Sequence, residues 1–508
     1  MNQPKGEFMI LNLIKKEIDT LNVSTLVIFS KASAQKDKAS KVTHSALSKV
    51  FQSAIDEKTI TGKQGEAVLF REKNYINYRH ILVVGLGKEN EITHESLRQS
   101  VAAIVDALKG ASINEAVIDF DGLQLGKKLA LEGTKAVAEG LMLASYVFDE
   151  LMSKKNDKKE MNLHVVTEST IDKAVKAAFT EGIELAGAVN FARRLGDMPG
   201  NLMTPTILAQ HAMDAAKGVA NLKVTAWDKA KIQKEKMGGL LGVSQGSTQE
   251  PRFIIMEYKG TAATKKPIAF VGKGLTFDCG GISIKPSAGM EEMKYDMCGG
   301  AAVIGTMLAI AKLKLKVNVV GLVPATENLA GPSATKPGDV HSARNGKTFE
   351  INNTDAEGRL ILSDALCYAT EQEPQMIVDV ATLTGAMVVA LGNTHTGYFT
   401  RNKDLKNKIE DAADQSGEWV WNMPLCDFHV KDMKGTYADL SNISAGKGAG
   451  SATAAAFLEQ FVGEGIPWAH FDIAGTGWAV GNRLPYCSKK GASGVMVRTF
   501  VELAKEYI

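Results

Sequence analysis

Residues 268–285 read IAFVGKGLTFDCGGISIK, and this stretch points to the fold class. Its first part, residues 268–272, is an apolar run with β-branched and aromatic side chains, which predicts a buried strand. Lys273 and Asp278 follow that run. In α/β proteins, ligands bind outside the carboxyl ends of parallel strands. Charged residues at this point therefore indicate a functional site at the edge of an α/β sheet.

The alternation of short apolar runs and helical patterns extends in both directions from this stretch. Strands are predicted at residues 24–30, 66–71, 81–85, 116–120, 163–167, 253–258, 268–272, 317–323 and 376–381, and helices at 45–57, 95–109, 134–153, 171–195, 300–314 and 357–370. This alternation predicts an α/β fold with two domains, each a mainly parallel sheet flanked by helices. The breaker DMPGN at 197–201 ends the long helical pattern. We expect an N-terminal domain at 1–180, a linking helix and turn at 181–200, and a C-terminal domain with the candidate site at 201–508.

Composition and charge narrow the class of protein. The chain has 508 residues, 45% of them hydrophobic and 23% charged, with a net charge of +2. This balance is typical of globular proteins and gives no general attraction to nucleic acid or to an anionic membrane. The five cysteines are widely spaced and include no C-x-x-C pair, which favours a reducing compartment over a disulfide framework.

Neither of the two apolar stretches is expected to be an export signal or a membrane span. The run at 8–14 is short and is followed at once by charged residues. The run at 376–392 contains Asp379, Thr382 and Thr384, and we expect it to form a buried strand and loop. The expected location is the cytoplasm.

Several familiar motifs occur only in part. GVSQG at 242–246 matches the G-x-S-x-G nucleophile pattern, but the β-rich run follows it instead of preceding it, so a glycine-rich turn is the preferred interpretation. The Gly-x-Gly pairs at 85–87 and 272–274 lack the third glycine of a dinucleotide site. The nine histidines include no H-E-x-x-H, so a metal in this protein would be held mainly by oxygen.

Carboxylates and cations gather in the C-terminal domain. Asp355 and Glu357 would face the same side of an extended segment. Two carboxylates so placed repel each other unless a cation lies between them. Together with Asp278 and Asp296 they could hold two metals about 3.5–4 Å apart, an arrangement common in hydrolases. Nearby cationic side chains would stabilise developing negative charge; the candidates are Lys285 and Arg359.

Each of these residues also has a simpler interpretation. Asp278 and Asp296 could cap a strand or helix end. Asp355 and Glu357 could favour a helix N-terminus, and Lys273 could be a surface lysine.

Three segments resemble a known family. The octapeptide NTDAEGRL at 353–360 is similar to the signature of the leucyl (cytosol) aminopeptidases. Residues 271–285, VGKGLTFDCGGISIK, and residues 296–305, DMCGGAAVIG, resemble the metal-binding segments of that family. The resemblance covers residue 201 to the C-terminus closely and the N-terminal part only in its architecture. It implies that the C-terminal domain is catalytic.

The resemblance also implies roles for individual residues. The metal ligands would be Lys273, Asp278, Asp296, Asp355 and Glu357, with Asp278 and Glu357 shared by two divalent ions, manganese or zinc. Lys285 and Arg359 would be the catalytic pair. Arg359, Gly358 and Leu383 would seat a bicarbonate ion that acts as general base. The pocket for the first substrate residue would include Met293, Thr382, Gly385 and Ala474.

The implied reaction is hydrolysis of the N-terminal peptide bond by water that two metals activate, with leucine and other mainly apolar residues released. Lys273 would have to be neutral in order to donate a lone pair to a metal, although the ordinary lysine pKa is near 10.4. Lys285 would stay charged in order to meet an oxyanion. The resemblance further implies a homohexamer.

The sequence departs from the family pattern at three positions. Cys279 stands where serine is common, and Ser244 replaces an expected glycine. Gly477 stands where some members carry a larger pocket residue, which leaves the side-chain preference open. The competing interpretation is a DNA-binding or regulatory hexamer that uses the same fold, with or without activity. The net charge of +2 gives that interpretation no support but leaves nucleic-acid binding open.

Overall fold

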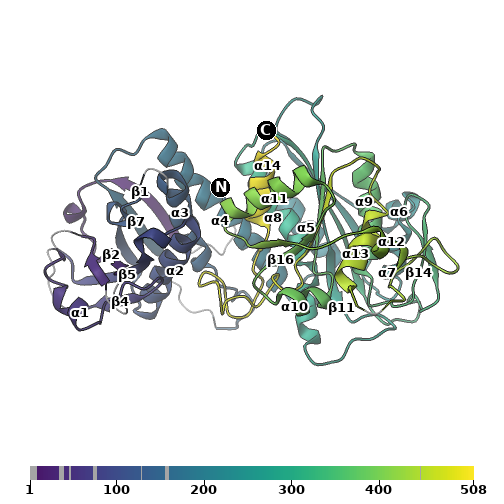
Figure 1. Ribbon diagram of the computed structural model, residues 1–508, viewed down its shortest axis with the longest axis horizontal. Helices are drawn as coiled ribbons and strands as arrows, with labels where there is room; N and C mark the ends of the chain where they lie inside the picture. Colours follow the sequence, from purple (N-terminus) through teal and green to yellow (C-terminus); the bar gives the residue numbers. More distant parts are fainter. Residues whose placement is uncertain are drawn as a thin grey trace. The chain divides into compact units, whose positions relative to one another are not determined.

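A computed structural model describes residues 9–33, 39–44, 47–71, 77–126, 129–154, 160–446 and 448–508. The chain forms two compact units (Figure 1). The first comprises Met1–Gly187 and Gly481–Ser488, and the second Ala188–Val480 and Lys489–Ile508. The division falls within helix α4 (Lys173–Asp197).

The first unit contains a seven-stranded sheet, and its centre is parallel. The strand order is β1 (Met9–Lys15), β7 (Met161–Thr167), β6 (Glu115–Asp119), β2 (Thr25–Ala32), β5 (His80–Lys88) and β4 (Ala67–Phe70), with β3 (Ala39–Val42) paired to β2. The first five strands of this order are parallel, and β3 and β4 are antiparallel additions. The helices here are α1 (Gln52–Asp56), α2 (His94–Gly110) and α3 (Ala130–Ser145).

Two helical predictions for this unit differ from the structure. The helix expected at 45–57 is confined to α1, and residues 45 and 46 lie outside the described residues. The helix expected at 134–153 begins earlier and ends at Ser145, where α3 gives way to an extended Tyr146. Strand β1 was not predicted, and its residues, MILNLIK, show no regular alternation of apolar and polar side chains.

The second unit contains a nine-stranded mixed sheet. Its order is β17 (Val420–Asn422), β16 (Thr396–Phe399), β19 (Trp468–Asp472), β15 (Ile377–Ala381), β10 (Ile268–Gly272), β12 (Asn318–Asn328), β9 (Arg252–Lys259) and β8 (Leu222–Trp227), with β11 (Gly274–Asp278) paired to β12. Strands β19, β15, β10, β12 and β11 run parallel to their neighbours in this group. A small sheet holds β13 (Val340–Ser342), β14 (Thr348–Glu350) and β18 (Leu440–Ser441).

Helices pack against both faces of this sheet. Successive side chains of β10 point to opposite faces, so each face contacts a different helix. Phe270 stacks on Phe500 of α14 (Val497–Lys505), with ring centroids 5.1 Å apart. Val271 packs on the opposite side with residues of α9 (Gly358–Glu371). Helix α8 (Cys298–Lys312) is buried on every side but its last residue, as expected for a helix covered by both sheet and helices. The two-domain α/β prediction is therefore confirmed.

The remaining helices of this unit complete the layers. They are α5 (Pro205–Ala215), α6 (Lys229–Lys234), α7 (Gly238–Ser244), the 3₁₀ segment η6 (Met290–Met297), α10 (Gly385–Leu391), α11 (Lys403–Ser416), α12 (Asp427–Lys431) and α13 (Gly450–Glu459). Residues 242–244 of the GVSQG pattern end α7, and the Ser244 hydroxyl donates to the carbonyl of Leu241. No strand leads into this serine, so the arrangement is not a nucleophile elbow.

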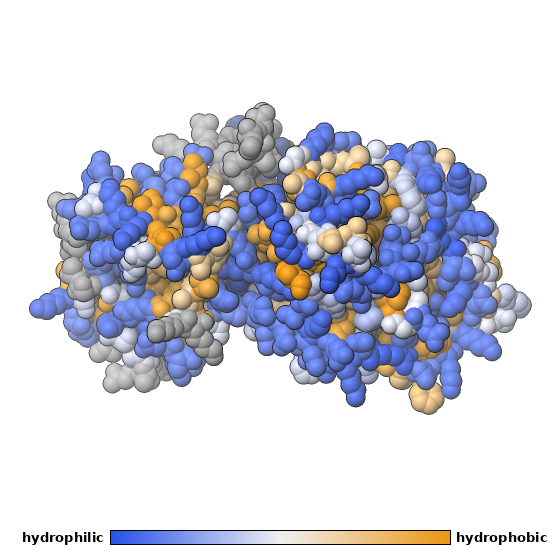
Figure 2. Space-filling view, turned by 90° about the horizontal axis from the view of Figure 1, so that it is seen from above, coloured by the Kyte–Doolittle hydropathy of each residue, from blue (hydrophilic) through white to orange (hydrophobic). Residues whose placement is uncertain are grey.

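Hydrophilic residues predominate on the face shown in Figure 2, with scattered apolar side chains among them. Within the described part of the chain, no helix is both long and apolar enough to span a bilayer.

Candidate metal centre

The charged residues predicted from the sequence meet at the carboxyl edge of the second sheet. Lys273 follows β10, Asp278 ends β11, and Thr382 follows β15. These strands are parallel to their neighbours, so their carboxyl ends lie at one edge of the sheet. The position is the one that α/β sheets use for ligands.

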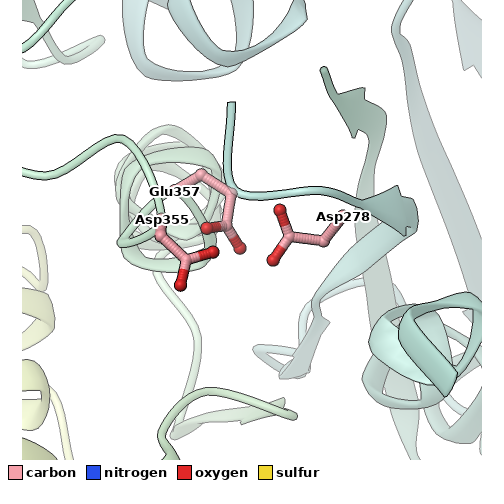
Figure 3. A group of neighbouring side chains, drawn as sticks. All are labelled: Asp278, Asp355 and Glu357. Atoms are coloured by element: carbon pink, nitrogen blue, oxygen red, sulfur yellow. The ribbon is translucent and has the colours of Figure 1, made fainter. Parts of the chain in front are cut away.

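Three carboxylates converge at this edge (Figure 3). Asp278, Asp355 and Glu357 each offer an oxygen atom, and the three atoms lie within 4.8 Å of one another. Asp355 and Glu357 come from the turn that leads into α9, and Glu357 is its N-cap. Asp278 and Glu357 are only 1% and 2% exposed, so their mutual repulsion is not relieved by water.

Two lysines lie between the carboxylates. Lys273 Nζ is 2.7 Å from Asp296 Oδ2 and 3.0 Å from Glu357 Oε1, and it donates to the carbonyl of Thr382. Lys285 Nζ is 2.8 Å from Asp278 Oδ2 and 2.5 Å from Asp355 Oδ1. All five predicted metal ligands and Lys285 are therefore brought together in one site. Lys273 is buried, which is not the surface position of the simpler interpretation.

Burial and mutual repulsion shift the pKa values of this cluster. Burial raises the pKa of Asp296 to about 6, and burial followed by repulsion from Glu357 raises the pKa of Asp278 and of Asp355. Burial would raise the pKa of Glu357 too, but attraction to Lys273 and Lys285 outweighs it and lowers this pKa. The four carboxylates therefore carry more negative charge than the two ammonium groups can neutralise.

The pKa values of the two lysines are also raised, but here the cause is attraction to the carboxylates. Burial alone would lower the pKa of Lys273, but attraction to Asp296 and Glu357 outweighs it and raises this pKa. The pKa of Lys285 is likewise raised, because Asp278 and Glu357 outweigh its burial. Without metal, both lysines are therefore ammonium groups. A neutral Lys273 remains a prediction for the metal-loaded site, where a cation must displace its proton.

Supporting residues orient these groups. Thr382 was predicted as a pocket residue, whereas no role was predicted for Asn328. The Asn328 amide, at the end of β12, donates to Asp278 Oδ1 at 2.8 Å and to the carbonyl of Thr354 at 3.0 Å. The Thr382 hydroxyl donates to Asp296 Oδ1 at 2.6 Å. Asn328 lies far from the motifs along the chain, so only its place at the end of a neighbouring strand could have indicated it.

Asp472 is a second supporting residue. It ends β19, and Asp472 Oδ1 accepts hydrogen bonds from the backbone N–H groups of Leu383 and Ala474. Its other oxygen accepts from the Thr384 hydroxyl at 2.6 Å. Two predicted site positions, Leu383 and Ala474, therefore lie on loops that Asp472 joins by hydrogen bonds.

Arg359, Gly358 and Leu383 are close to the cluster. Arg359 is buried; its Nη1 donates to the carbonyl of Asn442 at 2.8 Å, and burial lowers its pKa to about 10. Its Nε makes no hydrogen bond within the described residues. A Cβ on Gly358 would lie 2.8 Å from Lys273 Nζ and 3.0 Å from Leu383 Cδ1, so a larger residue here would displace the Lys273 side chain.

The predicted pocket residues have fewer contacts with the carboxylate cluster than the predicted metal ligands have. Thr382 contacts both Lys273 and Asp296. Gly385 begins α10 directly after its N-cap Thr384. Met293 lies in η6, three residues before Asp296, and is half-buried.

The donor set fits divalent cations. Glu357 Oε2 is buried and makes no hydrogen bond within the described residues, although an anionic oxygen in such a place requires a partner. Carboxylate oxygens in surplus over lysines form the oxygen-rich environment that manganese, magnesium and zinc accept. Among the described residues, Asp278, Asp355 and Glu357 form the one close group of metal-ligating side chains.

Fold and site together define an α/β protein with a group of converging carboxylates, of a kind that suits divalent cations, at the carboxyl edge of its larger sheet. Comparison with known proteins makes this class more specific. The catalytic domain of the cytosol aminopeptidase family matches residues 190–501, and the N-terminal domain of that family matches residues 26–155. The chain belongs to the cytosol aminopeptidase family.

Individual relatives agree with this assignment. The chain is 74% identical to a probable cytosol aminopeptidase of Bdellovibrio bacteriovorus over 98% of its length and 100% of the relative's. It is 42% identical to a probable cytosol aminopeptidase of Burkholderia pseudomallei, over 86% of this chain and 85% of the relative.

Solved structures show the same architecture. A mutant of tomato leucine aminopeptidase superposes with a TM-score of 0.87 at 31% identity, over 99% of this chain and 98% of that one. The bottromycin maturation enzyme BotP in complex with Mn superposes with a TM-score of 0.83 at 30% identity, over 95% and 99% of the two chains. The protein is thus a metal-dependent aminopeptidase, a hydrolase of peptides. The alternative of a DNA-binding or regulatory protein is not favoured.

Proposed function

We propose that Lys273, Asp278, Asp296, Asp355 and Glu357 hold two divalent metal ions, manganese or zinc, and that Asp278 and Glu357 are shared between them. The observation that carries the proposal is the buried surplus of carboxylates around two lysines, with one oxygen of Glu357 unpartnered among the described residues. The Mn complex of BotP supports manganese as one of the metals. When bound, such ions polarise a carbonyl and lower the pKa of bound water.

The side chains around the centre would orient the substrate. The free amine of a peptide is drawn to the anionic cluster, which limits cleavage to the N-terminal residue. Lys285, whose side chain is 21% exposed, would remain charged and stabilise the oxyanion that forms from the scissile carbonyl. Leucine and other mainly apolar side chains would enter a pocket that includes Met293, Thr382, Gly385 and Ala474.

Arg359 is proposed to seat a bicarbonate ion together with Gly358 and Leu383. Its unpartnered Nε offers an N–H donor beside the cluster, and burial strengthens any charged hydrogen bond made there. Bicarbonate would accept the proton that the attacking water releases. The family resemblance further supports a cytoplasmic homohexamer, which sedimentation analysis of the purified protein would test.

The central experiment measures metal content and activity in one preparation. We expect about two divalent ions per chain and hydrolysis of leucine p-nitroanilide. Activity should be lost after chelation and return with Mn²⁺ or Zn²⁺. Full activity after thorough removal of metal would contradict the proposal. Leucine p-nitroanilide with a blocked amine is the matched control and should not be cleaved.

A further inference from the structure

The small sheet of the second unit leads directly into the candidate metal centre. Its strands β14 and β18 are parallel, and Glu350 at the end of β14 pairs with Ser441 at the end of β18. Their carboxyl ends therefore lie side by side. Beyond β14 the chain continues into residues 352–357, which we call the metal loop because two of the proposed metal ligands lie on it. Beyond β18 it continues into Asn442.

Asn442 extends the pairing of these strands beyond the end of their backbone ladder. Its N–H donates to the carbonyl of Glu350 at 2.9 Å. Its side-chain Oδ1 accepts from the backbone N–H groups of Asn352 at 2.8 Å and Asn353 at 3.3 Å, and its Nδ2 donates to the carbonyl of Asn353 at 2.6 Å. Asn442 is 0% exposed, so water cannot take over these hydrogen bonds when the amide is changed.

The backbone of the same residue holds Arg359. The carbonyl of Asn442 accepts a hydrogen bond from Arg359 Nη1 at 2.8 Å. Arg359 lies in the first turn of α9, directly after the metal loop, and is buried. Asn442 is therefore bonded to the start of the metal loop through its side chain and to Arg359 through its carbonyl.

Other residues support the metal loop independently of Asn442. The Thr354 hydroxyl donates to the carbonyl of Gly280 at 2.6 Å, and the N–H of Thr354 donates to Ser283 Oγ at 3.1 Å. The amide of Asn328 donates to the carbonyl of Thr354. These contacts join the loop to the segment that carries the other metal ligands, so a change at Asn442 should leave the carboxylates able to bind metal.

From these contacts we infer that Asn442 is a positioning residue for peptide hydrolysis: it sets the place of Arg359 relative to the metal loop. Arg359 can assist the reaction only if the proton acceptor that it seats lies beside the metal centre, and a misplacement of about 1 Å can cost about 100-fold in rate. The inference rests on the role proposed for Arg359. It predicts that a change at Asn442 lowers kcat and spares metal binding.

The test compares Asn442→Asp with the native full-length enzyme. This change keeps the shape of the side chain but replaces its N–H donor by an oxygen, which cannot donate to the carbonyl of Asn353. We expect kcat for leucine p-nitroanilide to fall about 10- to 100-fold, with KM within about threefold of native and the metal content unchanged. Asn442→Ser introduces no charge and should show the same split between kcat and KM, which keeps the test decisive if the aspartate variant does not fold.

Asn318→Asp is the matched control for general damage. Asn318 is 8% exposed, and its amide donates to the carbonyls of Ala262 at 2.8 Å and Lys265 at 3.0 Å. It begins β12, at the end of the strand opposite to the metal centre. The control should lower Tm as Asn442→Asp does and keep native kcat. An equal loss of kcat in both variants would overturn the inference.

A double-mutant cycle tests whether Asn442 acts through Arg359. In an Arg359→Ala background, Asn442→Asp should add less than about threefold to the loss of kcat. The same loss in both backgrounds, or native kcat in the folded Asn442 variants, overturns the inference. Failure of the proposed function would look different, because Arg359→Ala alone would then keep native kcat or the native enzyme would lack its metals.

Discussion

Each of the two main sheets of this protein carries carboxylates at the carboxyl ends of its parallel strands, but these carboxylates make different contacts. In the first unit, Asp119 ends β6 and accepts a hydrogen bond from the backbone N–H of Gly122 at 2.9 Å. Asp121 follows it and accepts from the Thr167 hydroxyl at 2.7 Å and from the N–H of Glu168 at 2.8 Å. These carboxylates close turns between neighbouring strands.

At the corresponding edge of the second unit, the carboxylates face one another and two lysines. Asp278, Asp355 and Glu357 lie within one group, and Glu357 Oε2 has no hydrogen-bond partner among the described residues. The difference shows that a position at the carboxyl edge of a sheet does not by itself make a metal site. We expect a metal site only where buried carboxylates are left in surplus, as they are in this cluster.

Glu357→Ala should have the largest effect and tests whether the carboxylates of the second unit form the reaction centre. The change removes a carboxylate that we propose both metals share, and it leaves Asp296 as the only ion-pair partner of Lys273 among the described residues. We expect kcat for leucine p-nitroanilide to fall by at least about 1000-fold. Asp121→Ala, at the matching edge of the other sheet, should keep native kcat. Native activity in Glu357→Ala would show that the cluster is not the reaction centre.

Lys285→Met tests whether a cation beside the cluster does more than neutralise it. Loss of the ammonium removes a group that can stabilise an oxyanion, so kcat should fall by about 100-fold while metal content is retained. Steady-state kinetics and metal analysis on the same sample measure both quantities. Lys336→Met, which changes an exposed lysine paired with Asp339, serves as the control. Equal kcat in the two variants would remove Lys285 from the mechanism.

The raised pKa of Asp296 predicts a pH dependence. Its folded-state pKa is about 6 against an ordinary value of 3.8, so the metal-free folded protein takes up a proton as pH falls through 6. The stability that this protonation contributes to the metal-free protein is present below about pH 4 and is lost as pH rises through 6. Metal competes with that proton, so metal retention should fall below pH 6.

Gel filtration at pH 5, 6, 7 and 8 followed by metal analysis would measure this retention. Thermal unfolding of the metal-free protein over the same range should show the opposite trend, with Tm falling as pH rises toward 6. Metal retention that is the same at pH 5 and pH 8 would contradict the prediction.

The smallest expected effect comes from the first sheet. Asp119→Ala leaves the buried N–H of Gly122 without its acceptor, which should lower the free energy of unfolding by about 1–2 kcal/mol. Asp119→Asn keeps an acceptor oxygen and should cost less. Urea unfolding measures both, and kcat should be native in each. A large loss of activity at native stability would show that this edge also has a catalytic role.

Much of the fold was predictable because its signals are local. The apolar run at 268–272 is strand β10, and the pattern at 357–370 is helix α9 within a residue of each end. Of the helix predicted at 45–57, only Gln52–Asp56 is α-helical in the described residues. Apolar spacing alone does not show where tertiary contacts stabilise a helix. The edge strand β1 was not predicted, because its short, mainly apolar sequence MILNLIK lacks the regular alternation that marks a half-buried strand.

For the site, the sequence by itself determined which residue types were present: the acids at 278, 296, 355 and 357 and the bases at 273, 285 and 359 lie in short, recognisable segments. Only the tertiary structure decided how these groups are paired, and it added Asn328 and Asp472 as supports. It also showed that residues 481–488 belong to the first unit. The reason is physical, because pairing, burial and pKa depend on which strand ends become neighbours, and that arrangement is set by packing between segments far apart in the chain.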